Sequence, residues 1–205
     1  MKDIVERLIA NFQEWTLPDL MPRQLAFPEI HHKVTVVTGM RRTGKTSLCL
    51  ERLKDLQRKG VDKSRLLYLS FEDDRLLDFR ASNFQDILDV FYGMFPRNKD
   101  RLCYWVLDEI QRIDHWEAFV RRMIDTENIR LVLTGSSARL LSREIATALR
   151  GRSFDIEVLP FSFGEYLAYH KLCGSEALTF GDRTVARLRR AINDYLLVGG
   201  FPEIQ

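Results

Sequence analysis

The fold is decided by a stretch that reads Val34-Thr35-Val36-Val37-Thr38-Gly39-Met40-Arg41-Arg42-Thr43-Gly44-Lys45-Thr46. Residues 39–46 match the pattern G-x4-G-K-[ST], which binds phosphate groups when a buried strand precedes it and a helix follows it. Both conditions are met here. Residues 34–38 form an apolar, β-branched run, and apolar residues recur at helical spacing after Lys45. The stretch therefore predicts a strand, a phosphate-binding loop and a helix.

Each residue type in this loop has a chemical reason. Gly39 and Gly44 permit a backbone conformation in which several N–H groups converge on phosphate oxygens. Lys45 brings a positive charge to the β and γ phosphates. The helix that begins at Lys45 also points the positive end of its dipole at the phosphates. The hydroxyl of Thr46 can ligate Mg²⁺, and Ser47 can contact the α phosphate. The remaining loop residues that we expect to contact the nucleotide are Arg41, Arg42 and Thr43.

A second apolar run, residues 104–107, ends in the acids Asp108 and Glu109. Parallel sheets bind ligands at the carboxyl ends of their strands, where these acids would lie. We expect Asp108 to hold Mg²⁺ through water, with Thr46 as its partner. Glu109 would orient and deprotonate an attacking water, which serves hydrolysis rather than transfer to a substrate hydroxyl. The pair favours an ATPase.

A third apolar run, residues 129–134, is followed by hydroxyl residues. In P-loop ATPases with an additional strand, a polar residue at this point senses the γ-phosphate. Ser136 is our candidate for this role, with Thr134 behind it. Ser136 is equally suited to cap the helix that we expect to begin near Ala138, and one serine can do both.

Strands and helices alternate along the chain. The predicted strands span 34–38, 66–71, 102–107, 129–134 and 154–159. The predicted helices span 4–12, 45–58, 84–95, 116–125, 138–149 and 183–197. This alternation predicts an α/β fold with a parallel sheet that is covered on both faces. We divide the chain into an N-terminal helix and arm (1–30), a core (31–170) and a helical tail (171–205).

The composition is that of a folded, water-soluble chain. Of its 205 residues 45% are hydrophobic and 29% are charged, and the net charge of +2 identifies neither a nucleic-acid nor a membrane partner. Charged residues interrupt residues 1–20, which excludes a signal-peptide core or a membrane span there. The three cysteines lie far apart, which argues against a disulfide framework. We expect a cytoplasmic protein.

With these motifs the chain resembles the AAA-type ATPases of bacteria and archaea that carry an uncharacterised C-terminal domain, an offshoot of the AAA+ class. Beyond the motifs above, the matching segments are Pro22-Arg23, Ile110-Gln111, Leu149-Arg150-Gly151-Arg152, Pro160-Phe161-Ser162-Phe163-Gly164-Glu165-Tyr166 and Gly199-Gly200-Phe201-Pro202-Glu203. The resemblance implies a three-layer P-loop NTPase sandwich with strand order 5-1-4-3-2. It also implies a separate domain beginning near Gly199-Gly200, so this chain looks like the ATPase portion without that domain.

The resemblance further implies a role for Arg152, because related ATPases place arginines here that reach a nucleotide, sometimes that of a neighbouring subunit. Arg152 is either a catalytic residue or part of a solvated basic turn. A catalytic Arg152 would act either on the nucleotide of its own chain or on that of a neighbouring chain in a homo-oligomer. The expected function is Mg²⁺-dependent ATP binding and hydrolysis, coupled to a conformational change in an attached domain that acts on DNA or protein. The alternative is a nucleotide-dependent binding switch with negligible turnover.

Overall fold

The computed structural model describes residues 1–28, 33–135, 149, 151–172 and 181–204. Five parallel strands form one sheet in the order β2-β3-β4-β1-β5, which confirms the predicted order 5-1-4-3-2. The strands are β1 (Val34–Thr38), β2 (Leu66–Ser70), β3 (Cys103–Asp108), β4 (Ile129–Thr134) and β5 (Ser153–Glu157). Because β1 is buried along its whole length between β4 and β5, its five residues are apolar or threonine.

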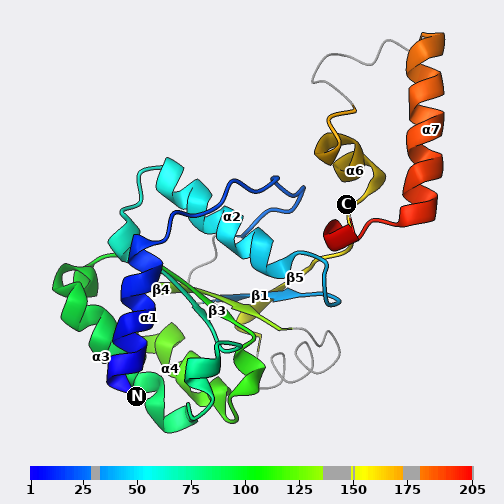
Figure 1. Cartoon of the computed structure of the whole chain (residues 1–205). Coiled ribbons are helices and arrows are strands. Elements are labelled where there is room, and N and C mark those ends of the chain that lie inside the picture. The colour runs from blue at the N-terminus through cyan, green and yellow to red at the C-terminus, as the bar shows by residue number, and fades with distance from the viewer. Residues whose placement is uncertain (29–32, 136–148, 150, 173–180, 205) are drawn as a thin grey trace.

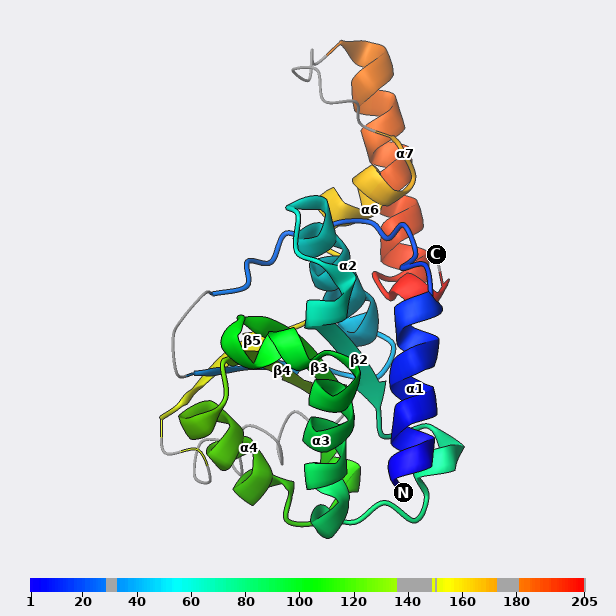
Figure 2. The same ribbon diagram turned by 90° about the vertical axis from the view of Figure 1, so that its left-hand side faces the viewer.

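Helices cover both faces of the sheet, which confirms the predicted three layers. Figures 1 and 2 show α2 (Lys45–Arg58) on one face and α3 (Phe84–Met94) and α4 (Trp116–Thr126) on the other. The N-terminal helix α1 (Lys2–Glu14) packs against α3 and the edge strand β2. The predicted helix 138–149 lies almost wholly outside the described residues.

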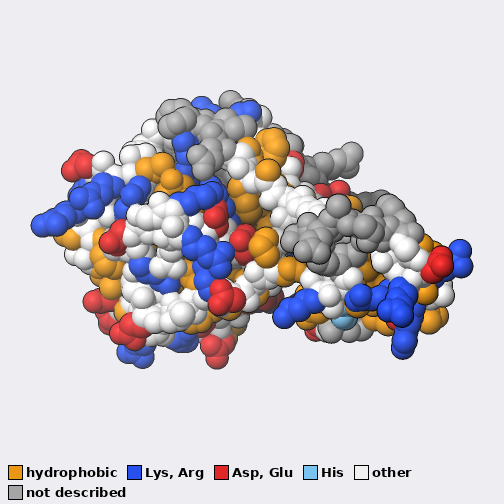
Figure 3. Space-filling model, turned by 90° about the horizontal axis from the view of Figure 1, so that it is seen from above, with side chains coloured by type: hydrophobic (Ala, Val, Ile, Leu, Met, Phe, Trp, Pro, Cys, Tyr) orange, Lys and Arg blue, Asp and Glu red, His pale blue; other side chains and the backbone are white. Residues whose placement is uncertain are grey.

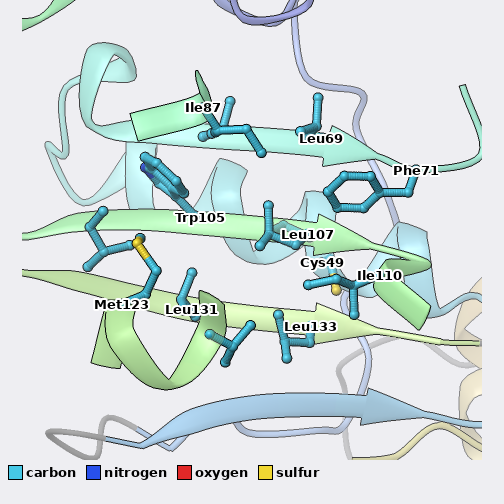
Figure 4. Close-up of a cluster of buried hydrophobic side chains, with 14 of the residues drawn as sticks. Cys49, Leu69, Phe71, Ile87, Trp105, Leu107, Ile110, Met123, Leu131 and Leu133 are labelled. Carbon is cyan, nitrogen blue, oxygen red and sulfur yellow. The ribbon is translucent and has the colours of Figure 1, made fainter. Parts of the chain in front are cut away.

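The core lies between the sheet and these helices. Figure 4 shows Leu69, Trp105 and Leu131, from three neighbouring strands, packed with Ile87 of α3 and Met123 of α4. Each of these side chains is at most 3% exposed. Full burial of an aliphatic side chain stabilises a fold by about 1.5–3 kcal/mol, so this layer fixes the sheet whose carboxyl edge carries the motifs.

The C-terminal helices form a second, smaller lobe (Figures 1 and 3). The short helix α6 (Phe163–Tyr169) packs with α7 (Asp182–Val198) through Tyr166, Leu167 and Ala191. The core that we predicted ends at residue 170, which is one residue beyond the end of α6. No described helix has both the length and the apolar character needed to cross a membrane.

Candidate functional site

The phosphate loop joins the carboxyl end of β1 to the first turn of α2. Gly39 has φ 146°, and a Cβ atom at this position would collide with the carbonyl oxygen of Val158, which follows β5. Gly44 has φ 90° in the left-handed region and occupies the N-cap position of α2. Both conformations favour glycine, which explains the residue type at both places. The N-terminus of α2 thus faces the loop, as phosphate binding requires.

Lys45 is held inside the loop. Its ammonium group donates hydrogen bonds to the carbonyl oxygens of Gly39 (3.0 Å) and Met40 (2.8 Å). Burial lowers the pKa of Lys45, while the negative charges of Glu109 and Asp108 oppose this shift. A phosphate group entering the loop would supply oxygen acceptors in place of these two carbonyls, so the charge of Lys45 is already in position.

Three hydroxyl groups surround the carboxylate of Asp108, which is 4% exposed. Thr46 and Tyr68 both donate to Oδ2, at 3.0 and 2.7 Å, and Thr134 donates to Oδ1. Burial and the charge of Asp108 raise the pKa of Tyr68 far above its usual value, so the phenol remains a donor. Thr46 and Asp108, the two residues that we expect to hold Mg²⁺, are therefore in direct contact.

Glu109 adopts an uncommon backbone conformation beside this carboxylate. Its φ of 55° and ψ of 41° lie in the left-handed region, which non-glycine residues seldom occupy. Its N–H group donates to Oγ1 of Thr134 at 3.1 Å, and its carboxylate accepts a hydrogen bond from the side-chain amide of Gln111. Non-glycine residues in this conformation are concentrated at functional sites.

These groups surround an open cavity of about 530 Å³. It is lined by Arg41, Arg42, Gly44, Lys45, Thr46, Glu72 and Glu109. Glu72 forms an ion pair with Arg112 (3.3 Å) and a longer one with Arg41 (4.0 Å) across the rim. The structure thus brings together most of the predicted cofactor-binding, catalytic and metal residues, with Ser47 exposed on the first turn of α2.

A second cavity, of about 520 Å³, adjoins the loop on the side of the C-terminal lobe. Its lining includes Arg23, Leu159, Phe161 and Tyr195. Arg23 also donates to the carbonyl oxygen of Thr43 in the phosphate loop at 3.0 Å. One arginine therefore contacts both the loop and the neighbouring cavity.

The segment after α7 returns to the loop. Arg42 forms an ion pair of 2.8 Å with Glu203, in the 3₁₀ turn Pro202–Ile204. This turn lies beside α2 in Figure 1. Gly200 is held against Phe161 by a hydrogen bond of 2.6 Å between the N–H of Phe161 and the carbonyl oxygen of Gly200. The Gly-Gly-Phe-Pro-Glu segment is therefore part of the site's surroundings.

One predicted residue, Ser136, lies outside the described residues, and another, Arg152, is not brought to this cavity. Arg152 immediately precedes β5, and its carbonyl oxygen accepts from the N–H of Val34 at the start of β1. The loop lies at the opposite end of β1, about 17 Å away for five residues of strand. The side chain of Arg152 instead forms an ion pair with Asp125 on α4.

The sequence did not predict Tyr68, Gln111, Glu72 or Arg23 as site residues. Tyr68 reaches Asp108 because Ser70 pairs with Asp108 in the β2–β3 register, and residues two apart share one face of a strand. Arg23 depends on the path of the N-terminal arm, which has no periodic signal. Gln111 and Arg23 both lie in segments that carry the family resemblance, but the sequence pattern assigned neither of them a role in the site.

The oxygen atoms at the site suit Mg²⁺. This ion prefers oxygen ligands and usually retains several waters, so one hydroxyl and one carboxylate are an ordinary protein contribution. Thr46 and Asp108 supply these two groups from different elements, and their 3.0 Å contact shows that they can share one ion. The residues present therefore fit a magnesium ion.

A five-stranded parallel sheet with a phosphate loop after β1 and paired acids after β3 defines a P-loop NTPase, a class of nucleotide-binding domain. A family model described as an AAA domain matches residues 31–167. The chain belongs to this family of AAA domains.

The chain is also similar to two curated relatives in sequence and to a solved structure in fold. An uncharacterized protein of Methanocaldococcus jannaschii is 32% identical over 97% of this chain and 42% of its own length. One of Haemophilus influenzae is 33% identical over 83% of this chain and 40% of its own length. The chain thus spans about two fifths of each of these relatives. The Aeropyrum pernix ORC2 protein, solved as ADPNP and ADP complexes, shares the fold with a TM-score of 0.50 and 13% identity, over 82% of this chain and 57% of that one.

Proposed function

We propose that this chain binds Mg-ATP and hydrolyses it, and that the nucleotide state changes the conformation of an attached domain. The observation that carries the proposal is the convergence of Lys45, Thr46 and Glu109 on one open cavity, with the buried carboxylate of Asp108 in contact with Thr46 beside it. The phosphates would lie in the loop at the N-terminus of α2, with Lys45 at the β and γ oxygens. Thr46 and Asp108 would hold the Mg²⁺ ion, which neutralises charge on the transferred phosphoryl group.

In the proposed reaction Glu109 acts as general base. A water oxygen attacks the γ-phosphorus, the bond from that phosphorus to the β–γ bridging oxygen breaks, and ADP leaves with the bonding electrons. The water proton passes to the Glu109 carboxylate and later to solvent. Gln111 donates a hydrogen bond to Oε2, one of the two oxygens of this carboxylate. Lys45 stabilises the charge that develops on the phosphoryl oxygens.

The base of the nucleotide would enter the second cavity. Arg23 contacts both the loop and this cavity, and Phe161 and Tyr195 are aromatic residues of its lining. Because this cavity lies between the arm and the C-terminal lobe, a bound base would contact both. That contact, together with the Arg42–Glu203 ion pair, supports coupling of the site to α6, α7 and a domain that follows them.

The same proposal extends to the partners of the attached domain. We propose that the longer protein acts on DNA or another protein, with the ATPase portion as its driver, and that active sites are completed in a homo-oligomer. A binding switch with negligible turnover is the second candidate. It is favoured by one observation, the hydrogen bond by which Gln111 holds Glu109.

The proposal is tested by comparing Glu109→Gln with the parent chain. The amide can still hydrogen-bond a water but cannot take its proton, so we expect retained Mg-ATP binding and a phosphate-release rate lowered about 10²–10⁴-fold. The matched control is Glu117→Gln, an acid in the first turn of α4 away from the cavity. Parent turnover that is negligible, with ATP binding retained, would favour the switch. Turnover that is unchanged in Glu109→Gln would place the base elsewhere.

A further inference from the structure

Tyr68 and Thr46 donate to the same oxygen of Asp108, and this shared acceptor distinguishes Tyr68 from the other residues near the cavity. The hydroxyl of Tyr68 lies 2.7 Å from Oδ2 and that of Thr46 lies 3.0 Å from it. Thr134 donates to the other oxygen, Oδ1. Asp108 therefore enters any reaction with both of its oxygens already oriented by hydroxyl donors.

The two donors to Oδ2, Thr46 and Tyr68, differ in what magnesium binding would require of them. Thr46 is itself a proposed ligand of the ion, so its hydroxyl must turn from Asp108 to the metal. Tyr68 has no such second role, and its strand is fixed by its pairing with β3. Tyr68 pairs with Val106 in the β2–β3 register, and its hydroxyl reaches Asp108, two positions further along β3. Tyr68 can therefore keep Oδ2 in place after Thr46 has left it.

The ring of Tyr68 is held from behind by the end of α1 and the residue after it. Its centroid lies 6.5 Å from that of Phe12 and 6.2 Å from that of Trp15. This part of the chain is bound to the start of β2, because Lys63 donates to the carbonyl oxygen of Trp15 at 2.7 Å and Gln13 donates to that of Leu66 at 3.1 Å. The position of the phenol thus depends on α1 as well as on β2.

We propose that Tyr68 is a positioning residue of the magnesium site, which keeps Oδ2 of Asp108 directed at the ion, and that Phe12 and Trp15 brace its ring. The inference rests on the proposed function. The hydrogen bond from Tyr68 has two opposite effects on magnesium affinity. It withdraws some negative charge from Oδ2, which lowers the affinity, and it fixes the direction of Oδ2, which raises the affinity. Residues that orient metal ligands change metal affinity by about 10–100-fold when removed, so orientation is the larger effect.

Tyr68→Phe tests the role of the hydroxyl alone, because the ring and its contacts with Phe12 and Trp15 remain. The measurement is calorimetric affinity for ADP in Mg²⁺ and in EDTA, and the readout is the ratio of the two affinities. We expect the ratio to fall about tenfold through loss of affinity in Mg²⁺, with binding in EDTA unchanged. A structural role would instead weaken binding equally in both conditions.

Tyr92→Phe is the matched control, because the hydroxyl of Tyr92 on α3 donates to Glu127 at 2.8 Å, away from the cavity. It should leave both affinities unchanged. A Tyr68→Phe variant with the parent's ratio, or with equal losses in both conditions, overturns the assignment of Tyr68. A parent chain that binds no nucleotide in either condition overturns the proposed function and this inference with it.

Trp15→Ala tests the brace, because Trp15 is 42% exposed and its truncation removes little of the core. We expect the ratio of its ADP affinities in Mg²⁺ and in EDTA to fall, as for Tyr68→Phe, but by a smaller factor. A parent-like ratio for Trp15→Ala would overturn the part of the inference that concerns α1.

Discussion

Nε of Arg23 lies 2.7 Å from Oε1 of Glu165, and both side chains are 7% exposed. This buried ion pair joins the N-terminal arm to α6. Arg23 also donates to the carbonyl oxygens of Thr43 and Leu159, while Glu165 accepts from the N–H groups of Gln24 and Ser162. The pair therefore connects the arm, the phosphate loop and the C-terminal lobe through two side chains.

The first prediction concerns the stability that this pair gives. Removing one partner of a buried pair leaves the other charge uncompensated, so Glu165→Ala should lower the free energy of unfolding by about 3–5 kcal/mol in urea titrations at pH 7. The control is Asp89→Asn, whose partner Lys2 lies with it on the surface, and it should change little. A Glu165→Ala variant as stable as the parent would show that the lobe is held by other contacts.

The same carboxylate gives a second prediction, for acid pH. Burial alone raises the pKa of Glu165, but hydrogen bonds from Arg23, Ser162 and Gln24 outweigh it and hold the pKa below its ordinary value of 4.5. A depressed pKa contributes stability above 4.5 that is lost as the pH falls through the folded-state value. The unfolding free energies of the parent and Glu165→Gln should therefore converge below pH 4.5. Curves that stay parallel would contradict the lowered pKa.

The third prediction is that Lys45→Ala abolishes nucleotide binding and leaves the fold intact. The ammonium group supplies charge at the phosphates, and its two present acceptors, the carbonyls of Gly39 and Met40, border a cavity that water can enter. Calorimetry with Mg-ATP measures the loss, and thermal unfolding checks the fold. The control is Lys59→Ala at the far end of α2, which should bind normally. Parent-like affinity in Lys45→Ala would contradict the assignment of the loop.

The fourth prediction concerns the ion pair of Arg42 with Glu203. A carboxylate at the rim repels phosphate and occupies an arginine that we expect to contact the nucleotide. Glu203→Gln should therefore tighten nucleotide binding by about two- to fivefold at low salt, with the gain lost in 0.5 M salt (about a 4 Å screening length). Glu6→Gln on α1 is the charge-matched control. Weaker binding in Glu203→Gln would show that the pair supports the site instead of competing with the nucleotide.

The sequence predicted the sheet and the phosphate site because both depend on local patterns. Residues 34–46 carry strand, loop and helix signals in one continuous run, and Asp108 ends an apolar run of the right length for a buried strand. Tyr68 could not be found this way, since its role depends on which residue of β3 stands across from it. The same holds for Arg23, whose partner Glu165 is 142 positions away in the chain.

Helix α6 was missed although a local signal for it exists. Ser162-Phe163-Gly164-Glu165 has the form of a capping box, and the structure contains both of its hydrogen bonds. The helix is only seven residues long, too short for the apolar periodicity that predicts the other helices. Glu165 thus closes the capping box and pairs with Arg23 at once, and the second contact was beyond any local pattern.

Arg152 gives the last prediction, because its position bears on how it could act. It stands at the amino end of β5 beside Val34, whereas the phosphate loop follows the carboxyl end of β1. With about 17 Å of strand between them, Arg152 cannot reach the nucleotide of its own chain. Its side chain is about half exposed and held by Asp125, so a neighbouring chain can approach it. We therefore propose that any catalytic role of Arg152 is exerted across a subunit interface.

Sharing of sites between chains predicts a specific result when two inactive variants are mixed. Lys45→Ala lacks its own nucleotide site but keeps Arg152, whereas Arg152→Ala keeps the site and lacks the arginine. Their mixture should recover part of the phosphate-release activity that each lacks alone, and the specific activity of the parent should rise with protein concentration. The control is Arg121→Ala on α4, which should hydrolyse ATP without the addition of a second variant. A mixture that stays inactive, together with parent activity that is independent of concentration, would remove Arg152 from the mechanism.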